Sequence, residues 1–311
     1  AIIDETGNVA TLGIVARNVK DRTQKELNLI ESIDKKSLCI KILSLRNNSS
    51  FEKSGTENKS LFSFPPTGTR RVLVLLIDFT DRTFTIAANN YNNLQNQVNY
   101  NNTGSFRDYW LANSYGTLTL NSTIGGWYNA THNLEYYGAN LYGNDVNPRL
   151  LVQEAIDQAE NAGIDFSLFD NDNDGYVDDI LIVHAGYGEE AGGGANTIWS
   201  HHWTLGSYQR TYDGVIINNY AIVPELRDNV GNNIINIGVI CHEFGHSLGL
   251  PDLYDTDLSN GGSEGIGRWG LMGSGNWNNN GASPSSLCAW SKIYLGWSVP
   301  QTLTSATDIS L

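Results

Sequence analysis

The pattern of apolar and polar positions along the chain predicts an α/β protein. Continuous apolar runs, which are typical of strands buried on both faces, and alternating stretches predict strands at 71–79, 117–127, 179–184 and 215–223. Apolar residues at helical spacing predict helices at 105–114, 150–162 and 234–249. Strands that alternate with helices in this way indicate an α/β core built around a sheet.

The first part of the chain differs from the remainder in pattern and in charge. It reads as a small α/β piece with a helix at 21–33 and a strand at 38–43, and 54–69 has the Ser, Thr, Gly and Pro content of a linker. Residues 1–61 contain 10 of the 19 basic residues and 8 of the 33 acidic ones, whereas the remainder has 9 and 25. We therefore predict two units, 1–61 and 62–311.

Composition and charge exclude two classes of partner. The 311 residues carry a formal net charge of −14, so the phosphate backbone of a nucleic acid would be repelled. No apolar run reaches the ~18 residues that a membrane span needs. The chain begins at Ala1 without a basic and apolar leader, from which we expect a secreted protein whose signal peptide has been removed. We also expect a monomer.

Three cysteines are too few for a disulfide scaffold. Cys241 and Cys288 can pair, which leaves Cys39 free, or all three are buried thiols that act as small hydrophobic side chains. The sequence leaves both interpretations open.

The most specific chemical signal is the sequence His-Glu-Phe-Gly-His that begins at His242. On a helix, residues four apart share a face, so His242 and His246 can bind one ion, and zinc suits two neutral imidazoles. Glu243 lies beside them as the general base, because it can accept a proton from a water that zinc acidifies to a pKa of ~7. Gly249 and Pro251 end the helix and turn the chain back.

Two acidic residues compete for the third position on the metal. Asp252 lies six residues after His246, where the chain turns back, and it is the preferred ligand. Glu264 lies 18 residues after His246, but the surrounding glycines disfavour the helix that such a ligand would need. Met272, the only methionine, stands in a glycine-rich turn, which is typical of the Met-turn that metzincin peptidases pair with their zinc motif.

A second metal site is predicted upstream, in the segment Asp-Asn-Asp-Asn-Asp-Gly that begins at residue 170. It supplies carboxylates at loop positions 1, 3, 5 and 9, with Gly at position 6, as in loops of the EF-hand type that bind calcium. The four acidic ligands are Asp170, Asp172, Asp174 and Asp178, and Tyr176 and Asp179 are further candidates. Leu181 replaces the usual Glu at position 12, and clustered carboxylates repel unless a cation neutralises them. We expect a structural calcium ion here.

Further candidates for the cleft are weaker. His184 ends a predicted buried strand and either lines the cleft or packs in the core, and His202 and its neighbour His201 reach the substrate or pack. A residue that stabilises the oxyanion of the transition state is expected in such a site. Tyr254, Tyr294 and these histidines all qualify, and the sequence does not choose among them.

The stretches HEFGHSLGLPDLYD (242–255), WGLMGSGNW (269–277) and AWSKIYLGW (289–297) resemble the immune inhibitor A family of secreted bacterial metallopeptidases. The resemblance covers about 70–300. It implies a metzincin-like catalytic domain with a twisted mixed sheet, an active-site helix and a Met-turn, an extracellular location, and a latent zymogen. It also implies that 1–61 is a pro-segment that acts as an intramolecular inhibitor. In the family an aspartate of this segment caps the zinc.

The residue that caps the zinc is left open. Asp4, Asp21 and Asp34 are the aspartates of the predicted pro-segment, and a thiolate of Cys39 is a rival. A different interpretation of 1–61 is a domain extension without an inhibitory role.

The sequence therefore predicts a secreted zinc endopeptidase that acts on proteins or peptides, with zinc for catalysis and calcium for structure. The alternative is a catalytically silent adhesion module of the same fold that kept its metals. Retention of the base Glu243 argues against that alternative, because a silent module does not need it. A zinc hydrolase acting on non-peptide substrates is a third possibility, which the family resemblance disfavours.

Overall fold

The computed structural model describes residues 2–3, 9–10, 64–141, 143–256 and 262–300. The chain forms two compact units, which are Ala1–Lys59 with Asp255–Gly265, and Ser60–Tyr254 with Ile266–Leu311. In the smaller unit, β1 (Ile2–Ile3) pairs with β2 (Val9–Ala10) in antiparallel orientation.

The helix and strand predicted at 21–33 and 38–43 lie outside the described residues, as do Asp4, Asp21, Asp34 and Cys39. The pro-segment and its boundary therefore stay predictions. The following description concerns the larger unit.

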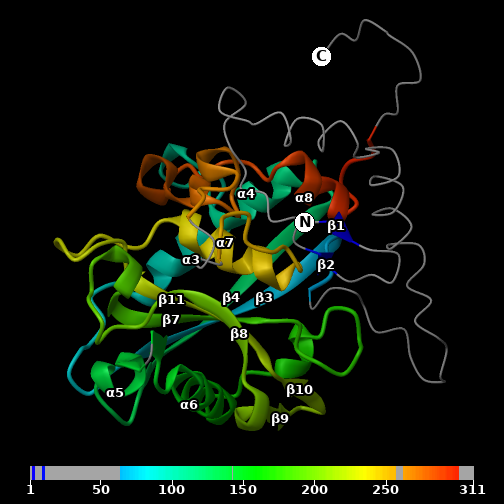
Figure 1. Ribbon diagram of the computed structural model, residues 1–311. Coiled ribbons are helices and arrows are strands. Elements are labelled where there is room, and N and C mark those ends of the chain that lie inside the picture. The colour runs from blue at the N-terminus through cyan, green and yellow to red at the C-terminus, as the bar shows by residue number, and fades with distance from the viewer. Residues whose placement is uncertain (1, 4–8, 11–63, 142, 257–261, 301–311) are drawn as a thin grey trace, which may run out of the picture. The chain divides into compact units, whose positions relative to one another are not determined.

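The larger unit is built on a five-stranded mixed sheet with the order β4-β3-β7-β11-β8 (Figure 1). Its strands are β3 (Gly68–Asp78), β4 (Leu118–Asn129), β7 (Ile180–Tyr187), β8 (His201–Thr204) and β11 (Asn219–Leu226). The first four strands of this order are parallel, and β8 pairs with β11 in antiparallel orientation at the edge. The α/β class and the mixed sheet predicted from the sequence are confirmed.

Helices cover both faces of the sheet (Figure 1). One face carries α3 (Ala88–Asn96), α4 (Phe106–Asn113), α7 (Ile237–Ser247) and α8 (Ala289–Tyr294). The other face carries α5 (Leu134–Gly138) and α6 (Pro148–Asn161). Two short hairpins are β5 (Asn140–Leu141) with β6 (Asn144–Asp145), and β9 (Arg210–Tyr212) with β10 (Val215–Ile217).

Strand β3 explains why the sheet needs helices on both faces. Its apolar run sends alternate side chains to opposite sides, because side chains of a strand alternate with a period of two. Val72, Val74 and Leu76 enter the core that contains α7. Leu73, Leu75 and Ile77, which lie between them, enter the core that contains α6. All six are buried, so the continuous apolar run correctly predicted a central strand.

Two predictions of secondary structure differ from the observed fold. The single strand predicted at 215–223 is wrong, because the chain breaks at Asn218 into β10 and β11, which belong to different sheets. Asn218 accepts the N–H of Leu205 on its backbone carbonyl (2.7 Å) and the N–H of Gly206 on its side chain (3.0 Å). Helix α3 and strand β8 were not predicted, because their polar composition gives no clear apolar period.

The described cysteines are both free thiols, so the pairing of Cys241 with Cys288 is not observed. Cys241 lies on α7 and is fully buried in the core, and burial raises the pKa of its thiol. Cys288 lies 3.4 Å from the hydroxyl of Ser291. The interpretation of Cys241 as a small hydrophobic side chain fits this environment.

A cluster of aromatic rings anchors α7 to the rest of the core. The ring of Phe244 meets those of Phe64, Phe106 and Trp110 edge to face, with centroid distances of 4.8, 5.0 and 5.4 Å. Phe244 lies between His242 and His246 in the sequence, so it points into the core while the two histidines share another face of the helix.

We expect Phe244→Ala to lower the free energy of unfolding by about 3–5 kcal/mol, because it removes a buried ring and leaves a cavity. Denaturant unfolding followed by tryptophan fluorescence measures this change. The control is Val98→Ala at a position that is 71% exposed, which should change the free energy by less than about 0.5 kcal/mol. Equal small effects of the two substitutions would contradict the anchoring role.

Candidate metal centre and cleft

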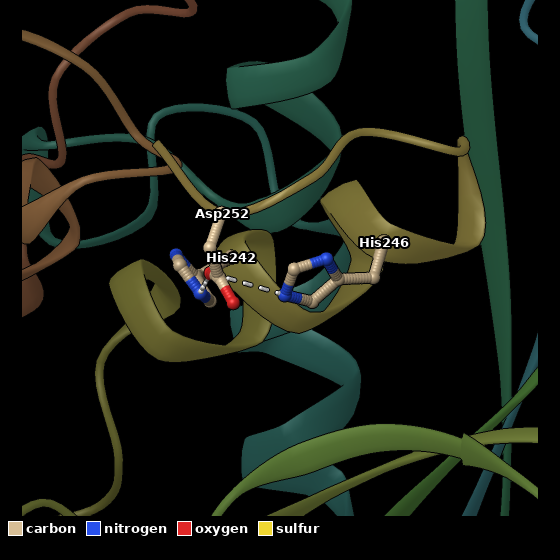
Figure 2. Close-up of side chains that lie close together, drawn as sticks. All are labelled: His242, His246 and Asp252. Atoms are coloured by element: carbon tan, nitrogen blue, oxygen red, sulfur yellow. Dashed lines mark ion pairs between the residues drawn. The ribbon is translucent and has the colours of Figure 1, made fainter. Parts of the chain in front are cut away.

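The end of α7 turns the chain back toward the two histidines. The N–H of Gly249 bonds to the carbonyl of His246 (2.8 Å), and the N–H of Leu250 bonds to that of Gly245 (3.0 Å). These are the two bonds of a Schellman motif, which needs a residue at positive φ, and Gly249 has a φ of 79°. The reversal brings Asp252 over the helix face that carries the histidines (Figure 2).

Three side chains converge above α7. Oδ1 of Asp252 lies 3.1 Å from Nε2 of His242 and 3.5 Å from Nε2 of His246 (Figure 2). One potential ligand atom from each residue lies within 4.8 Å of the other two. The two rings are nearly perpendicular, with an angle of 88°, and therefore present their nitrogens to one point from two directions.

Backbone carbonyls fix which nitrogen of each ring carries the proton. Nδ1 of His242 lies 3.0 Å from the carbonyl of Leu271, and Nδ1 of His246 lies 2.8 Å from that of Leu250. A carbonyl oxygen can only accept, so each Nδ1 is the donor, and a neutral ring then has a lone pair on Nε2. Two lone pairs thus face a carboxylate oxygen, and they repel unless a cation lies among them. This donor set fits zinc.

Electrostatics around the three residues favour a positive charge at the same place. Burial alone would raise the pKa of Asp252, but His242 and His246, which donate from Nε2 when they are protonated, outweigh burial and hold that pKa below its usual value. Burial would lower the pKa of each histidine, and the Asp252 carboxylate raises it instead. Burial raises the pKa of the adjacent Glu243, which makes it a stronger base than an exposed glutamate.

Met272 lies directly under the histidine helix, in the turn where the sequence predicted a Met-turn. Its side chain is 1% exposed. A Cβ added at Gly245 would lie 2.5 Å from the sulfur of Met272, so the methionine occupies the room that a larger side chain at 245 would need. Its carbonyl accepts the N–H of Leu253 (2.7 Å), next to Asp252. The turn therefore supports both the helix and the returning segment.

The three residues and Glu243 line a cleft of about 960 Å³. Its opposite wall is the edge strand β8 and the segment before it, with Trp199, His202 and Trp203. Tyr254 also lines the cleft, and its ring stacks on that of His242 with a centroid distance of 6.4 Å.

The structure separates the weaker candidates. His202 lines the cleft, with Nε2 3.5 Å from a carboxylate oxygen of Asp179. His184 does not line it, because β7 is central and buries this ring in the core against Phe79, where burial lowers its pKa to about 4. Tyr294 does not line it either, since its ring stacks on Trp290 along α8.

In the predicted calcium loop, the carboxylates of Asp170, Asp172 and Asp174 come within 4.8 Å of one another. Asp170 accepts the N–H groups of Asp174 and Gly175, both at 3.0 Å, which closes the loop. Gly175 has a φ of 88°, as the sharp turn requires. Tyr176 contributes its N–H, which bonds to the Asp174 carboxylate at 2.9 Å.

Two further predicted members of the calcium shell, Asp178 and Asp179, lie outside this group of three carboxylates. The carboxylate of Asp178 accepts the side-chain amide of Asn171 (2.6 Å), and burial raises its pKa to about 7. Asp179 points to the opposite side of the extended chain, because successive side chains alternate. There it lies under α7 and accepts the hydroxyl of Ser247 and the N–H of Ile180.

Sequence reasoning missed Glu190, which shapes the cleft. Glu190 lines it and accepts hydrogen bonds from the hydroxyl and the N–H of Ser200, at 2.6 and 3.2 Å. The pair of acidic residues in the stretch Gly-Tyr-Gly-Glu-Glu was the available signal, but nothing local indicates which of the two faces the cleft.

The sequence is similar to those of known metallopeptidases. The family model described as immune inhibitor A peptidase M6, catalytic domain, matches residues 88–300. The chain is 37% identical over 224 residues to pre-pro-metalloprotease PrtV of Vibrio cholerae, covering 61% of this chain and 23% of that protein. It is 34% identical over 224 residues to immune inhibitor A of Bacillus thuringiensis, covering 61% and 31%. The chain spans less than a third of the length of these relatives.

Among solved structures, metalloproteinase-II from Bacteroides fragilis shares 12% identity and a TM-score of 0.33, over 82% of this chain and 59% of that chain. A likeness at this level supports no conclusion about the fold.

The two candidates for the third ligand can be separated experimentally. Glu264 is an exposed residue of the smaller unit, whereas Asp252 faces the histidines. We expect Asp252→Asn to weaken zinc binding by more than about tenfold. Substitutions of residues that only support a metal ligand already reach about tenfold, and loss of a ligand should cost more. Glu264→Gln is the matched control and should bind one zinc ion like the unaltered protein. Competition with a chromogenic chelator measures both, and the reverse result would assign the ligand to Glu264.

Proposed function

Because the chain belongs to the immune inhibitor A peptidase M6 family, we propose that it is a zinc endopeptidase that cleaves proteins or peptides outside the cell. His242, His246 and Asp252 would hold the zinc ion. The observation that carries the proposal is the convergence of their three acceptor atoms beside a buried glutamate in an open cleft. The name of one relative, pre-pro-metalloprotease PrtV, supports the same activity.

The chain's own residues supply the proton transfers. A bound zinc ion would polarise the scissile carbonyl and acidify the attacking water. Glu243 lines the cleft and has a raised pKa, so it can accept the proton of that water and return it to the leaving amine. Tyr254, His201 and His202 line the cleft, whereas Tyr294 does not. Both ring nitrogens of His201 already have partners, the carbonyl of Trp199 and the hydroxyl of Tyr220, so we favour Tyr254 and His202 for the oxyanion.

We further propose a structural calcium ion on Asp170, Asp172 and Asp174. The loop is joined to the sheet through Asn171, which accepts the N–H of Arg71 on its side chain (2.8 Å) and the guanidinium of Arg70 on its carbonyl (2.7 Å). An ion that neutralises the three carboxylates would therefore stabilise the connection between β3 and the start of β7.

Latency through residues 1–61 and a monomeric state remain parts of the proposal. The described residues contain no helix that is long and apolar enough to cross a membrane. A catalytically silent adhesion module is the alternative, and the buried Glu243 beside the metal ligands favours the enzyme.

We expect Glu243→Gln to lower the rate of casein cleavage by about 100- to 10,000-fold, because an amide cannot accept the proton. Zinc content, measured by mass spectrometry, should remain at the unaltered level. The control is Glu135→Gln, an exposed position outside the cleft, which should keep full activity. Near-normal cleavage by Glu243→Gln would refute the role of the base.

Calcium should raise the melting temperature of the protein relative to the calcium-free protein. We expect Asp174→Asn to remove most of this increment, because it weakens one of three clustered oxygen ligands. Asp165→Asn is the control, since Asp165 caps a neighbouring 3₁₀ helix and should leave the calcium increment intact. Differential scanning calorimetry with and without calcium measures it, and no increment in the unaltered protein would exclude the site.

A further inference from the structure

Glu190 is an acidic residue in the cleft that the proposed chemistry does not use. It lies in the short 3₁₀ helix Glu189–Ala191, and its carboxylate accepts the hydroxyl and the N–H of Ser200. It lines the same cleft as Glu243, and its negative charge is one of the causes that raise the pKa of Glu243. The carboxylate therefore lies close to the reaction centre.

Among the residues that the structure describes, this carboxylate has no cationic partner. Within the described ranges, no salt bridge involves Glu190, and no Lys or Arg lines the cleft. Arg227, the basic residue of the small recess that Glu190 also borders, pairs with Asp228 at 2.9 Å. Burial raises the pKa of Glu190, which reflects the cost of keeping a charge there without a partner.

The position of the carboxylate is built into the backbone. It lies over Gly188, where a Cβ would approach its two oxygens to 2.5 and 2.7 Å. Gly188 has a φ of −86°, which any residue can adopt, so the glycine provides room rather than backbone freedom. The neighbouring Glu189 serves as a contrast, because its carboxylate accepts the side-chain amide of Asn140 (2.9 Å) and lies outside the cleft lining.

Two indole rings line the same cleft as this carboxylate. Trp199, which precedes the Ser200 partner, is 54% exposed and lines the cleft. Trp277 lines both the cleft and the small recess that Glu190 borders. An indole face next to a carboxylate is suited to the apolar stem and the cationic head of a Lys or Arg side chain.

We propose that Glu190 makes the cleft selective for substrates with a Lys or Arg side chain close to the scissile bond. This inference rests on the proposed peptidase function. The substrate cation would form an ion pair with a carboxylate that has none among the described residues, and Ser200 would hold that carboxylate in place.

The test uses the full chain in its active form. Mass spectrometry of casein products first identifies a cleaved bond, and fluorogenic peptides then place arginine, or its neutral isostere citrulline, at each of three positions on either side. The unaltered enzyme should favour arginine over citrulline at one position by about 10- to 100-fold in kcat/KM. Glu190→Gln, which keeps an acceptor for Ser200, should bring this ratio near one.

Two variants guard against a merely structural explanation. Glu189→Gln removes the same charge one residue away and should leave the arginine preference unchanged. Gly188→Ala should displace the Glu190 carboxylate and lower the preference at least threefold, and it keeps the test decisive if Glu190→Gln does not fold. A structural role alone would change the rates on both peptides equally.

The possible failures are distinguishable. An enzyme that cleaves both peptides of every pair at equal rates overturns the selectivity, while its cleavage supports the proposed function. An arginine preference that survives both Glu190→Gln and Gly188→Ala also overturns the role of Glu190. A zinc-loaded chain that cleaves no peptide or protein at all overturns the proposed function itself.

Discussion

The site depends on one constraint, which is that two backbone carbonyls force two imidazoles to aim bare nitrogens at a carboxylate. The carbonyls of Leu250 and Leu271 hold Nδ1 of His246 and His242 as donors, so both Nε2 lone pairs face Asp252. The Nε2 lone pairs and the Asp252 carboxylate repel one another until a positive charge lies among them. Binding of a divalent ion should therefore contribute directly to folding stability, as it does where ligands would otherwise repel.

The carbonyls themselves depend on longer-range packing. The Schellman turn, which requires Gly249, places the carbonyl of Leu250. The carbonyl of Leu271 is placed by the turn in which the Met272 side chain packs against Gly245. Both turns are fixed relative to α7 because Phe244 anchors that helix in the aromatic core. In the motif 242–246, Phe244 thus packs in the core, Gly245 leaves room for Met272, and the two histidines face the metal site.

The features that the sequence could predict are those that a few adjacent residues determine. The histidine spacing, the helix stop at Gly249 and the loop turn at Gly175 are local signals, because a few adjacent residues determine them. The fold class followed from apolar runs such as β3 for the same reason. The partners Asp179 and Ser247 are 68 residues apart and meet only because β7 lies under α7, and no local pattern carries that information. The break at Asn218 likewise depends on bonds to a distant loop.

The charges of the cleft also come from residues that are far apart in the sequence, and they explain the importance of Glu190. Glu190, Glu243 and Asp252 are three carboxylates in one cleft, and the described residues that line it include no Lys or Arg. A divalent ion on Asp252 does not neutralise all three, so an excess of negative charge remains in a partly desolvated space. Such a field raises the local concentration of cationic groups and repels acidic ones. With a divalent ion bound, the charges of the cleft would therefore balance only when the substrate supplies a further positive charge.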